Sequence, residues 1–208
     1  IQAGNARASR ATVADFDGDG TNELAIISTN RLHVFEQDLS IKWSKVVVDG
    51  SAITSATAFD FEGDGDMEVV YRDEQKLYVI EGTTGATKTS RTCGSGTRVE
   101  MPVIADVDAD GEAEIICSCD NLGGVQRTVV FTSNESPWLP TRKVWNSIHY
   151  APTFVNDDLT IPANRQDKAS IPKLDIYAAQ AYITDTAGKI VYPALPDFVT
   201  TFDSATVN

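Results

Sequence analysis

The sequence predicts an all-β protein built as an array of repeated four-stranded units. Three segments align with one another: residues 11–28, 55–72 and 101–118. The alignment brings Asp15, Asp60 and Asp106 into register, at separations of 45 and 46 residues. The apolar runs in these segments are short and rich in β-branched residues, and none shows a sustained helical period. A repeat of this length is typical of arrays in which each unit contains four strands.

The first two copies contain the same order of elements. An acidic turn is followed by an apolar run, LAII or VV, and then by a second run at residues 31–36 or 76–81, again 45 residues apart. Gly, Asn, Asp and Thr bound these runs, as they do in strands joined by turns. In the third copy EIIC precedes RTVVF, and residues 120–126 between them predict a longer hairpin.

The acidic turns predict metal sites. With the first Asp as position 1, carboxylates recur at positions 1, 3, 5 and 9, and position 6 is glycine. The candidate ligands are Asp15, Asp17, Asp19, Thr21 and Glu23; Asp60, Glu62, Asp64, Asp66 and Glu68; and Asp106, Asp108, Asp110, Glu112 and Glu114. Position 7 is expected to contribute its main-chain carbonyl. Because Ca²⁺ takes about six to eight oxygen ligands, we expect one Ca²⁺ in each loop, about three ions in all.

Two other interpretations of the loops are weaker. An EF-hand needs a bidentate Glu at position 12 between helices, whereas here that position falls on Ile26, Tyr71 and Cys117 inside expected strands. Solvated acidic turns would explain one copy, because Asp and Gly are common in turns. Three copies in register favour metal binding.

The net charge of −13 comes mostly from these loops. They contain fourteen of the thirty acidic residues, so sixteen acids face seventeen bases in the rest of the chain. Such a balance argues against a nucleic-acid partner, which requires clustered Lys and Arg. No apolar run is long enough for a transmembrane segment. The first ten residues also lack the layout of a signal peptide.

The loop pattern D-x-D-G-D-G-x-x-E between two strands resembles the FG-GAP/VCBS repeats of calcium-binding β-propellers, the group that includes the integrin α-subunit head. The resemblance covers about residues 1–132, although the Phe-Gly and Gly-Ala-Pro signatures are absent. It implies that each repeat is one four-stranded blade whose acidic loop joins the first two strands and holds one Ca²⁺. Because propellers typically have four to eight blades, we expect a partial propeller from a longer protein.

Composition changes near Phe131. Seven of the eight prolines lie from Pro137 onward, and thirteen of the fourteen glycines lie before Val125. Residues 137–162 carry Trp138, Trp145, Tyr150 and Phe154 among prolines, so we expect an extended segment that packs its aromatics against the blades. An aromatic platform for carbohydrate is the alternative.

A second resemblance concerns this segment. The motifs W-x-P-x-R-x-V-W-N at residues 138–146 and V-N-D-D-L-T-I-P at 155–162 are similar to the segment after such propellers in large Bacteroidetes surface proteins, exported by the type IX system and including gliding-motility adhesin-like proteins. It implies a secreted, cell-surface protein of many modules. We therefore expect three blades in 1–132, a wrapping segment in 133–196 and the start of an Ig-like sandwich in 197–208.

The cysteines and histidines give no sign of an active site. Cys93 is expected to pair with Cys117 or Cys119, or all three remain buried thiols; Cys117 and Cys119 share one strand face and do not pair with each other. His33 is expected to pack in a strand, and His149 has no nucleophile nearby in the sequence.

The predicted function is that of a non-catalytic, calcium-stabilised extracellular module of a large adhesin-like protein. Its expected partners are a protein or glycan ligand on a surface, together with secretion or outer-membrane proteins. The alternative from another class is a carbohydrate-binding or carbohydrate-active, lyase-like propeller protein.

Overall fold

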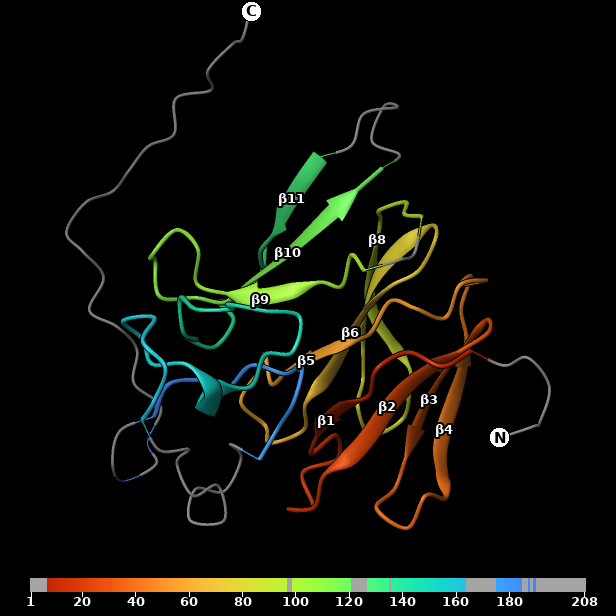
Figure 1. Cartoon of the computed structure of the whole chain (residues 1–208), viewed down its shortest axis with the longest axis horizontal. Coiled ribbons are helices and arrows are strands. Elements are labelled where there is room, and N and C mark those ends of the chain that lie inside the picture. The colour runs from red at the N-terminus through yellow and green to blue at the C-terminus, as the bar shows by residue number, and fades with distance from the viewer. Residues whose placement is uncertain are drawn as a thin grey trace, which may run out of the picture.

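The computed structural model describes residues 7–96, 99–120, 127–134, 136–163 and 175–184, and the single residues 187 and 189. It confirms the all-β prediction: the described residues form eleven strands and one short 3-10 helix, η1 (Pro152–Phe154). The strands make three antiparallel sheets that follow one another along the chain (Figure 1). Among the described residues, no helix has the length and apolar character needed to cross a membrane.

The first two sheets have four strands each, in chain order. The first contains β1 (Thr12–Ala14), β2 (Glu23–Ser28), β3 (Arg31–Phe35) and β4 (Ile41–Val46). The second contains β5 (Thr57–Phe59), β6 (Glu68–Arg72), β7 (Lys76–Ile80) and β8 (Thr87–Thr92). The described part of the third copy gives three strands in the order β11-β10-β9, namely β9 (Val103–Ala105), β10 (Glu114–Cys119) and β11 (Arg127–Phe131).

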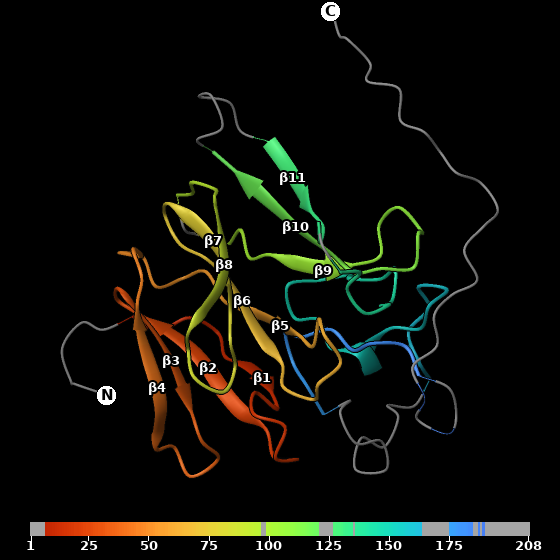
Figure 2. The ribbon, with the colours of Figure 1, turned by 180° about the vertical axis from the view of Figure 1, so that it is seen from behind.

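The sheets lie side by side with their first strands toward the middle of the molecule. β1 contacts β5, and β5 contacts β9. The views from the front and from behind show the same arrangement (Figures 1 and 2). In the part of the chain that the structure describes, the sheets do not close into a ring. The prediction of four-stranded units is confirmed for the first two copies, since the third sheet has three described strands.

Two apolar cores lie between the sheets, one between each neighbouring pair. Between the first two, Phe16, Val34 and Trp43 pack with residues such as Val69 and Tyr71. Between the second and third, the core contains Phe59, Val70, Leu77, Ile104 and Ile115. Strand β6 of the middle sheet lies between the two cores and is buried along its whole length, whereas the outer strand β8 of the same sheet is mostly exposed. In the first sheet, β2 alternates between buried and half-buried residues. Because β6 lies between two cores, its residues 69–71 do not alternate between apolar and polar as they would in a strand with one exposed face.

The described parts of the expected wrapping segment run beside the first strands. The Leu139 amide donates to the Phe61 carbonyl at 3.0 Å, and the Gln180 amide donates to Ala58 at 2.8 Å. Trp138 packs on Phe61, with ring centroids 4.5 Å apart. The three-domain division stays a prediction. Residues 197–208, where we expect a sandwich to begin, lie outside the described residues, as do 121–126 of the longer hairpin.

Candidate metal centres

Each acidic loop connects the first and second strands of its sheet: β1 to β2, β5 to β6, and β9 to β10. The glutamate at position 9 is the first residue of the second strand in every copy, at Glu23, Glu68 and Glu114. Strand pairing therefore fixes this carboxylate beside the start of its loop. Since strands flank all three loops, the EF-hand interpretation is excluded.

The loops turn through the left-handed region of backbone space at two positions. Position 6 has a φ of 90° at Gly20, 101° at Gly65 and 91° at Gly111, as the glycine pattern predicts. Position 4 is also left-handed, with φ of 69° at Gly18, 76° at Gly63 and 68° at Ala109. The sequence contained this second signal as glycine in two of three copies, but the interpretation of the loops missed it.

Hydrogen bonds to backbone amides hold the carboxylates of positions 1 and 9 in place. At position 1, Asp15 accepts from Gly20 at 3.0 Å and Asp106 accepts from Ala109 at 2.7 Å. At position 9, one carboxylate oxygen accepts from the amide of position 2: Phe16 to Glu23 at 2.7 Å, Phe61 to Glu68 at 3.0 Å, and Val107 to Glu114 at 2.9 Å. One oxygen of each glutamate therefore closes the loop. The other oxygen has no hydrogen-bond partner in Glu23 and Glu114, whereas in Glu68 it accepts from Lys88 at 2.9 Å.

Buried carboxylate oxygens without a hydrogen-bond partner gather in the first and third loops. They are Asp15 Oδ1, Asp17 Oδ1, Glu23 Oε1, Asp106 Oδ2 and Glu114 Oε1. Glu23 is 0% exposed and Glu114 is 2% exposed. An unpaired carboxylate is costly to bury, and a cation that these oxygens coordinate would remove that cost. Their hard oxygen chemistry fits Ca²⁺.

The raised pKa values of glutamates in the first and third loops also favour a bound cation. Burial raises the pKa of Glu23 to about 7, and the nearby Asp17 and Asp15 add to the rise. Burial also raises the pKa of Glu114 to about 7, with Asp108, Asp110 and Asp106 as the neighbouring charges. A divalent cation among these groups would favour their ionised forms.

Ten of the fourteen predicted carboxylate ligands are brought together. Oxygens within 4.8 Å of one another come from Asp15, Asp17, Asp19 and Glu23; from Glu62, Asp64 and Glu68; and from Asp106, Asp108 and Glu114. Asp60, Asp66, Asp110 and Glu112 lie outside these groups. At position 7, the Thr21 hydroxyl donates to Asp19 of the first group at 2.5 Å, and Asp66 accepts from the Thr83 hydroxyl at 2.7 Å. Ligation by individual residues stays a prediction.

Two lysines that the sequence interpretation did not single out also enter this region. Lys42 of β4 forms ion pairs with Asp17 and, at 2.9 Å, with Glu36. Lys88 of β8 forms ion pairs with Glu62 and, at 2.9 Å, with Glu68. Their spacing of 46 residues is one more than the offset of 45 between the first two copies, because the turn between β7 and β8 is one residue longer than the turn between β3 and β4.

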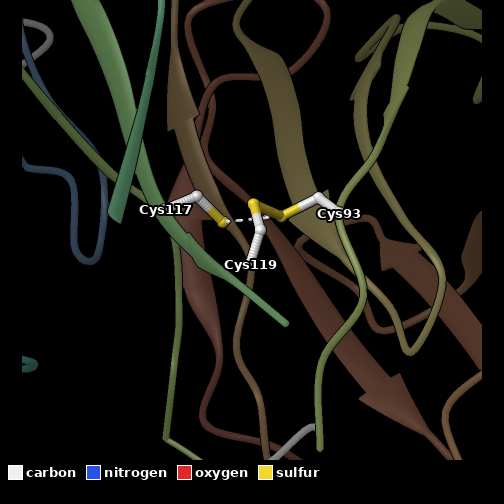
Figure 3. Close-up of side chains that lie close together, drawn as sticks. All are labelled: Cys93, Cys117 and Cys119. Carbon is white, nitrogen blue, oxygen red and sulfur yellow. Dashed lines mark hydrogen bonds between the residues drawn. A yellow bond between two sulfur atoms is a disulfide. The ribbon is translucent and has the colours of Figure 1, made fainter. Parts of the chain in front are cut away.

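The cysteines form a second cluster between the second and third sheets (Figure 3). Cys93 pairs with Cys119, which selects one of the two predicted pairings. Cys117 is a buried free thiol whose sulfur lies 3.7 Å from that of Cys93. Burial raises the pKa of Cys117 to about 11, so its thiol is protonated at neutral pH and is a poor metal ligand.

Both histidines form hydrogen bonds with hydroxyl groups. His33 lies between the hydroxyls of Ser28, at 2.9 Å, and Ser44, at 2.7 Å. His149 contacts the Tyr177 hydroxyl. Neither histidine is joined to a cysteine or carboxylate by a hydrogen bond in the described part of the chain. The expectation that the chain is not an enzyme stays a prediction.

Comparison with known proteins identifies the repeats. The family model described as FG-GAP-like repeat matches residues 15–71 and 60–117, and each match begins at the first Asp of an acidic loop. The curated proteins contain no significant match.

Solved structures give a likeness in fold. The crystal structure of the V. cholerae biofilm matrix protein Bap1 is similar over 83% of this chain, with a TM-score of 0.67 and 23% identity. The chain spans only 28% of that protein's length. The Photorhabdus luminescens Tc holotoxin pore matches over 62% of this chain and 7% of its own, at 17% identity and a TM-score of 0.28, too low to indicate a shared fold.

Proposed function

We propose, from the FG-GAP-like repeats that this chain contains, that it is a non-catalytic, calcium-stabilised module of a larger extracellular, adhesin-like protein. The observation that carries the proposal is the convergence of buried, unpartnered carboxylate oxygens in the first and third loops. In this proposal each acidic loop holds one Ca²⁺, which joins the loop to the first residue of the second strand. Ion binding then contributes directly to the stability of each sheet.

The sheets act in this proposal as blades of a partial β-propeller. The contacts of β1 with β5 and of β5 with β9 support it, because the first strands of neighbouring blades meet around a propeller axis. Two four-stranded antiparallel sheets in chain order also support it.

An extracellular location is supported by two observations. The Cys93–Cys119 disulfide is typical of proteins from oxidising compartments. The fold likeness is to a protein described as a biofilm matrix protein. A surface ligand, protein or glycan, follows from the adhesin-like role. The expected link to Bacteroidetes, type IX secretion and gliding motility has no support from the comparisons.

Carbohydrate binding is the second candidate function. An open pocket of about 640 Å³ lies next to the third loop and is lined by Asp106, Arg142, Asn156, Asp157 and Tyr182, among others. Such polar side chains with one aromatic ring suit a sugar. Saturable binding to members of a glycan array would favour this candidate, and a surface-protein ligand without glycan binding would favour the first.

Thermal unfolding of the full chain with and without Ca²⁺ tests the metal proposal. We expect EDTA to lower Tm and Ca²⁺ in excess to restore it, because an ion at about 100 times its Kd stabilises the folded state by about 2.7 kcal/mol per site. Mg²⁺ at the same concentration is the control, and we expect a smaller shift because it suits such all-protein sites less well. A melting curve unchanged by EDTA and by Ca²⁺ would contradict the proposal.

A further inference from the structure

Lys42 and Lys88 occupy the same special position in the first two sheets. In β4, Trp43 pairs with Val34 and Ile41 pairs with Phe35, so Lys42 is the extra residue of a β-bulge. In β8, Thr89 pairs with Val79 and Thr87 pairs with Ile80, so Lys88 is the extra residue there. A bulge re-aims the side chain of its extra residue. In both sheets the lysine is aimed at the acidic loop.

The two lysines contact equivalent carboxylates. Each one pairs with position 3 of its loop, Asp17 or Glu62. Each also pairs with the glutamate that follows the third strand, Glu36 at 2.9 Å for Lys42 and Glu81 at 3.6 Å for Lys88. The arrangement is therefore part of the repeat and not a single surface ion pair.

The lysines differ in how far they reach into the loop. Lys88 donates to Glu68 Oε1 at 2.9 Å, the carboxylate oxygen that its loop-closing hydrogen bond leaves free. Lys42 has no ion pair with Glu23, whose Oε1 remains without a hydrogen-bond partner, as do one oxygen of Asp15 and one of Asp17. In the second loop, the Lys88 ammonium group therefore occupies the position beside Glu68 Oε1 that a bound cation would take. In the first loop, the Lys42 ammonium group reaches Asp17 but leaves Glu23 Oε1 unpartnered.

Among the described residues, no lysine pairs with the third loop in this way. In the described ranges the third sheet has no counterpart of β4 or β8, and no Lys or Arg pairs with the acids of this loop. Lys143 is exposed and lines the neighbouring pocket together with Asp106, but among the described residues it forms no ion pair with the acids of this loop. Asp106 Oδ2 and Glu114 Oε1 are buried and unpartnered.

We propose that Lys42 and Lys88 are tethered counter-cations that compete with the divalent ion, so that the third loop binds Ca²⁺ most tightly and the second loop most weakly. The proposal rests on Ca²⁺ binding by the loops. An entering ion must displace the Lys88 ammonium from Glu68 and is repelled by its charge. The lysine also keeps the second sheet neutralised when Ca²⁺ is scarce.

Calorimetric titration of the full chain with Ca²⁺ tests the competition. We expect Lys88→Met to tighten the weakest binding event about tenfold, the effect of removing one charge-assisted hydrogen bond from the competing state. Lys76→Met is the matched control, because Lys76 is exposed on the neighbouring strand β7, and it should leave all binding events unchanged. Equal affinities in the Lys88→Met variant and the wild type would overturn the inference.

Two loop variants decide the order of affinity without altering a lysine. Glu114→Gln should abolish the tightest binding event, and Glu68→Gln should leave it intact. The reverse result would overturn the inference even if Lys88→Met fails to fold. A wild-type chain that binds no Ca²⁺ would instead contradict the proposed function. Binding with the opposite order would leave that function standing and remove only the role of the lysines.

Discussion

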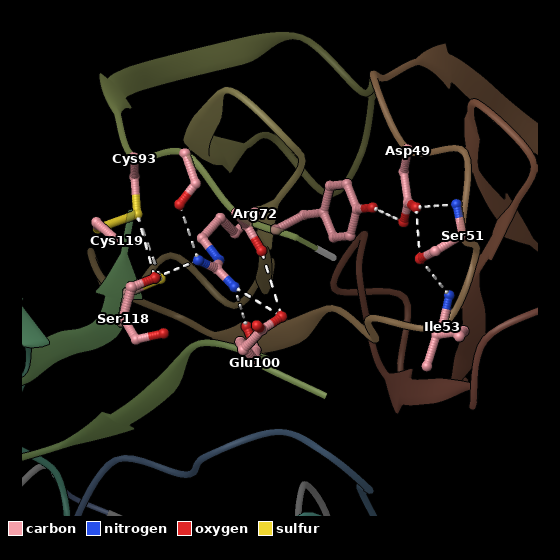
Figure 4. Close-up of polar contacts among 12 residues, drawn as sticks. Asp49, Ser51, Ile53, Arg72, Cys93, Glu100, Ser118 and Cys119 are labelled. Atoms are coloured by element: carbon pink, nitrogen blue, oxygen red, sulfur yellow. Dashed lines mark hydrogen bonds and ion pairs between the residues drawn. A yellow bond between two sulfur atoms is a disulfide. The ribbon is translucent and has the colours of Figure 1, made fainter. Parts of the chain in front are cut away.

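Arg72 on β6 donates a hydrogen bond of 3.0 Å to the backbone carbonyl of Glu100, in the chain that leads into the third sheet (Figure 4). The same guanidinium donates to the carbonyls of Ser118 on β10 and, at 3.3 Å, of Gly94. It lies 3.3 Å from the Glu100 carboxylate and is 1% exposed. One buried cation therefore joins the second sheet to the third through backbone oxygens.

Replacement of this cation should destabilise the protein. Arg72→Met removes the guanidinium that donates to three backbone carbonyls and pairs with the Glu100 carboxylate, so we expect the free energy of unfolding to fall by about 3 kcal/mol. Arg91→Met on exposed β8 is the control, with an expected change within about 0.5 kcal/mol. Urea unfolding measures both. Equal effects of the two variants would mean that the buried contacts contribute no net stability.

The first and second sheets are joined in a different way. Trp43 on β4 donates from its indole nitrogen to the Gly82 carbonyl at 2.6 Å. Trp43→Phe keeps an aromatic ring but loses the donor and part of the packed volume. We expect a loss of about 1–3 kcal/mol of unfolding free energy. Thr89 holds the matching place on β8 and is exposed, so Thr89→Val should change stability little. A Trp43→Phe variant as stable as the wild type would show that this contact does not hold the sheets together.

The sequence predicted the parts of the fold that repeat. The acidic loops, the flanking strands and the left-handed glycine of position 6 follow from local residue patterns that recur three times. The contacts of Arg72 could not be predicted, because VVYR is an ordinary strand end until the third sheet is placed beside it. The positions of Lys42 and Lys88 also depend on strand register, since a bulge exists only relative to the partner strand. The choice of Cys119 over Cys117 required the placement of β10 as well.

The pairing of Cys93 with Cys119 gives a further prediction. Closing a loop between residues 26 apart in the sequence stabilises the folded state by about 3 kcal/mol in the chain-entropy treatment, so Cys93→Ser should lose about that much. Cys117→Ala should keep the disulfide and lose about 1 kcal/mol or less. Alkylation and mass spectrometry of the denatured variants count the free thiols. A Cys117→Ala variant without a disulfide would contradict the observed pairing.

The third loop contains a local strain that a single substitution can release. Ala109 has a φ of 68°, where the first two loops have Gly18 and Gly63. A residue with a Cβ costs about 1 kcal/mol or more in this region, because the side chain crowds the backbone. Ala109→Gly should therefore raise the free energy of unfolding by about 0.5–1 kcal/mol, with some of the gain offset by the entropy of glycine in the unfolded chain.

The reciprocal change isolates the backbone effect. Gly20 has a φ of 90°, and a Cβ added there would have no atom within 4 Å. Gly20→Ala should thus destabilise by about 1 kcal/mol through conformation alone. Both variants are compared with the wild type by urea unfolding in EDTA, so that ion binding does not enter the difference. Because the two substitutions exchange the same two residue types at left-handed positions, their effects must have opposite signs. Destabilisation by Ala109→Gly would show that position 4 of the third loop does not require the left-handed backbone.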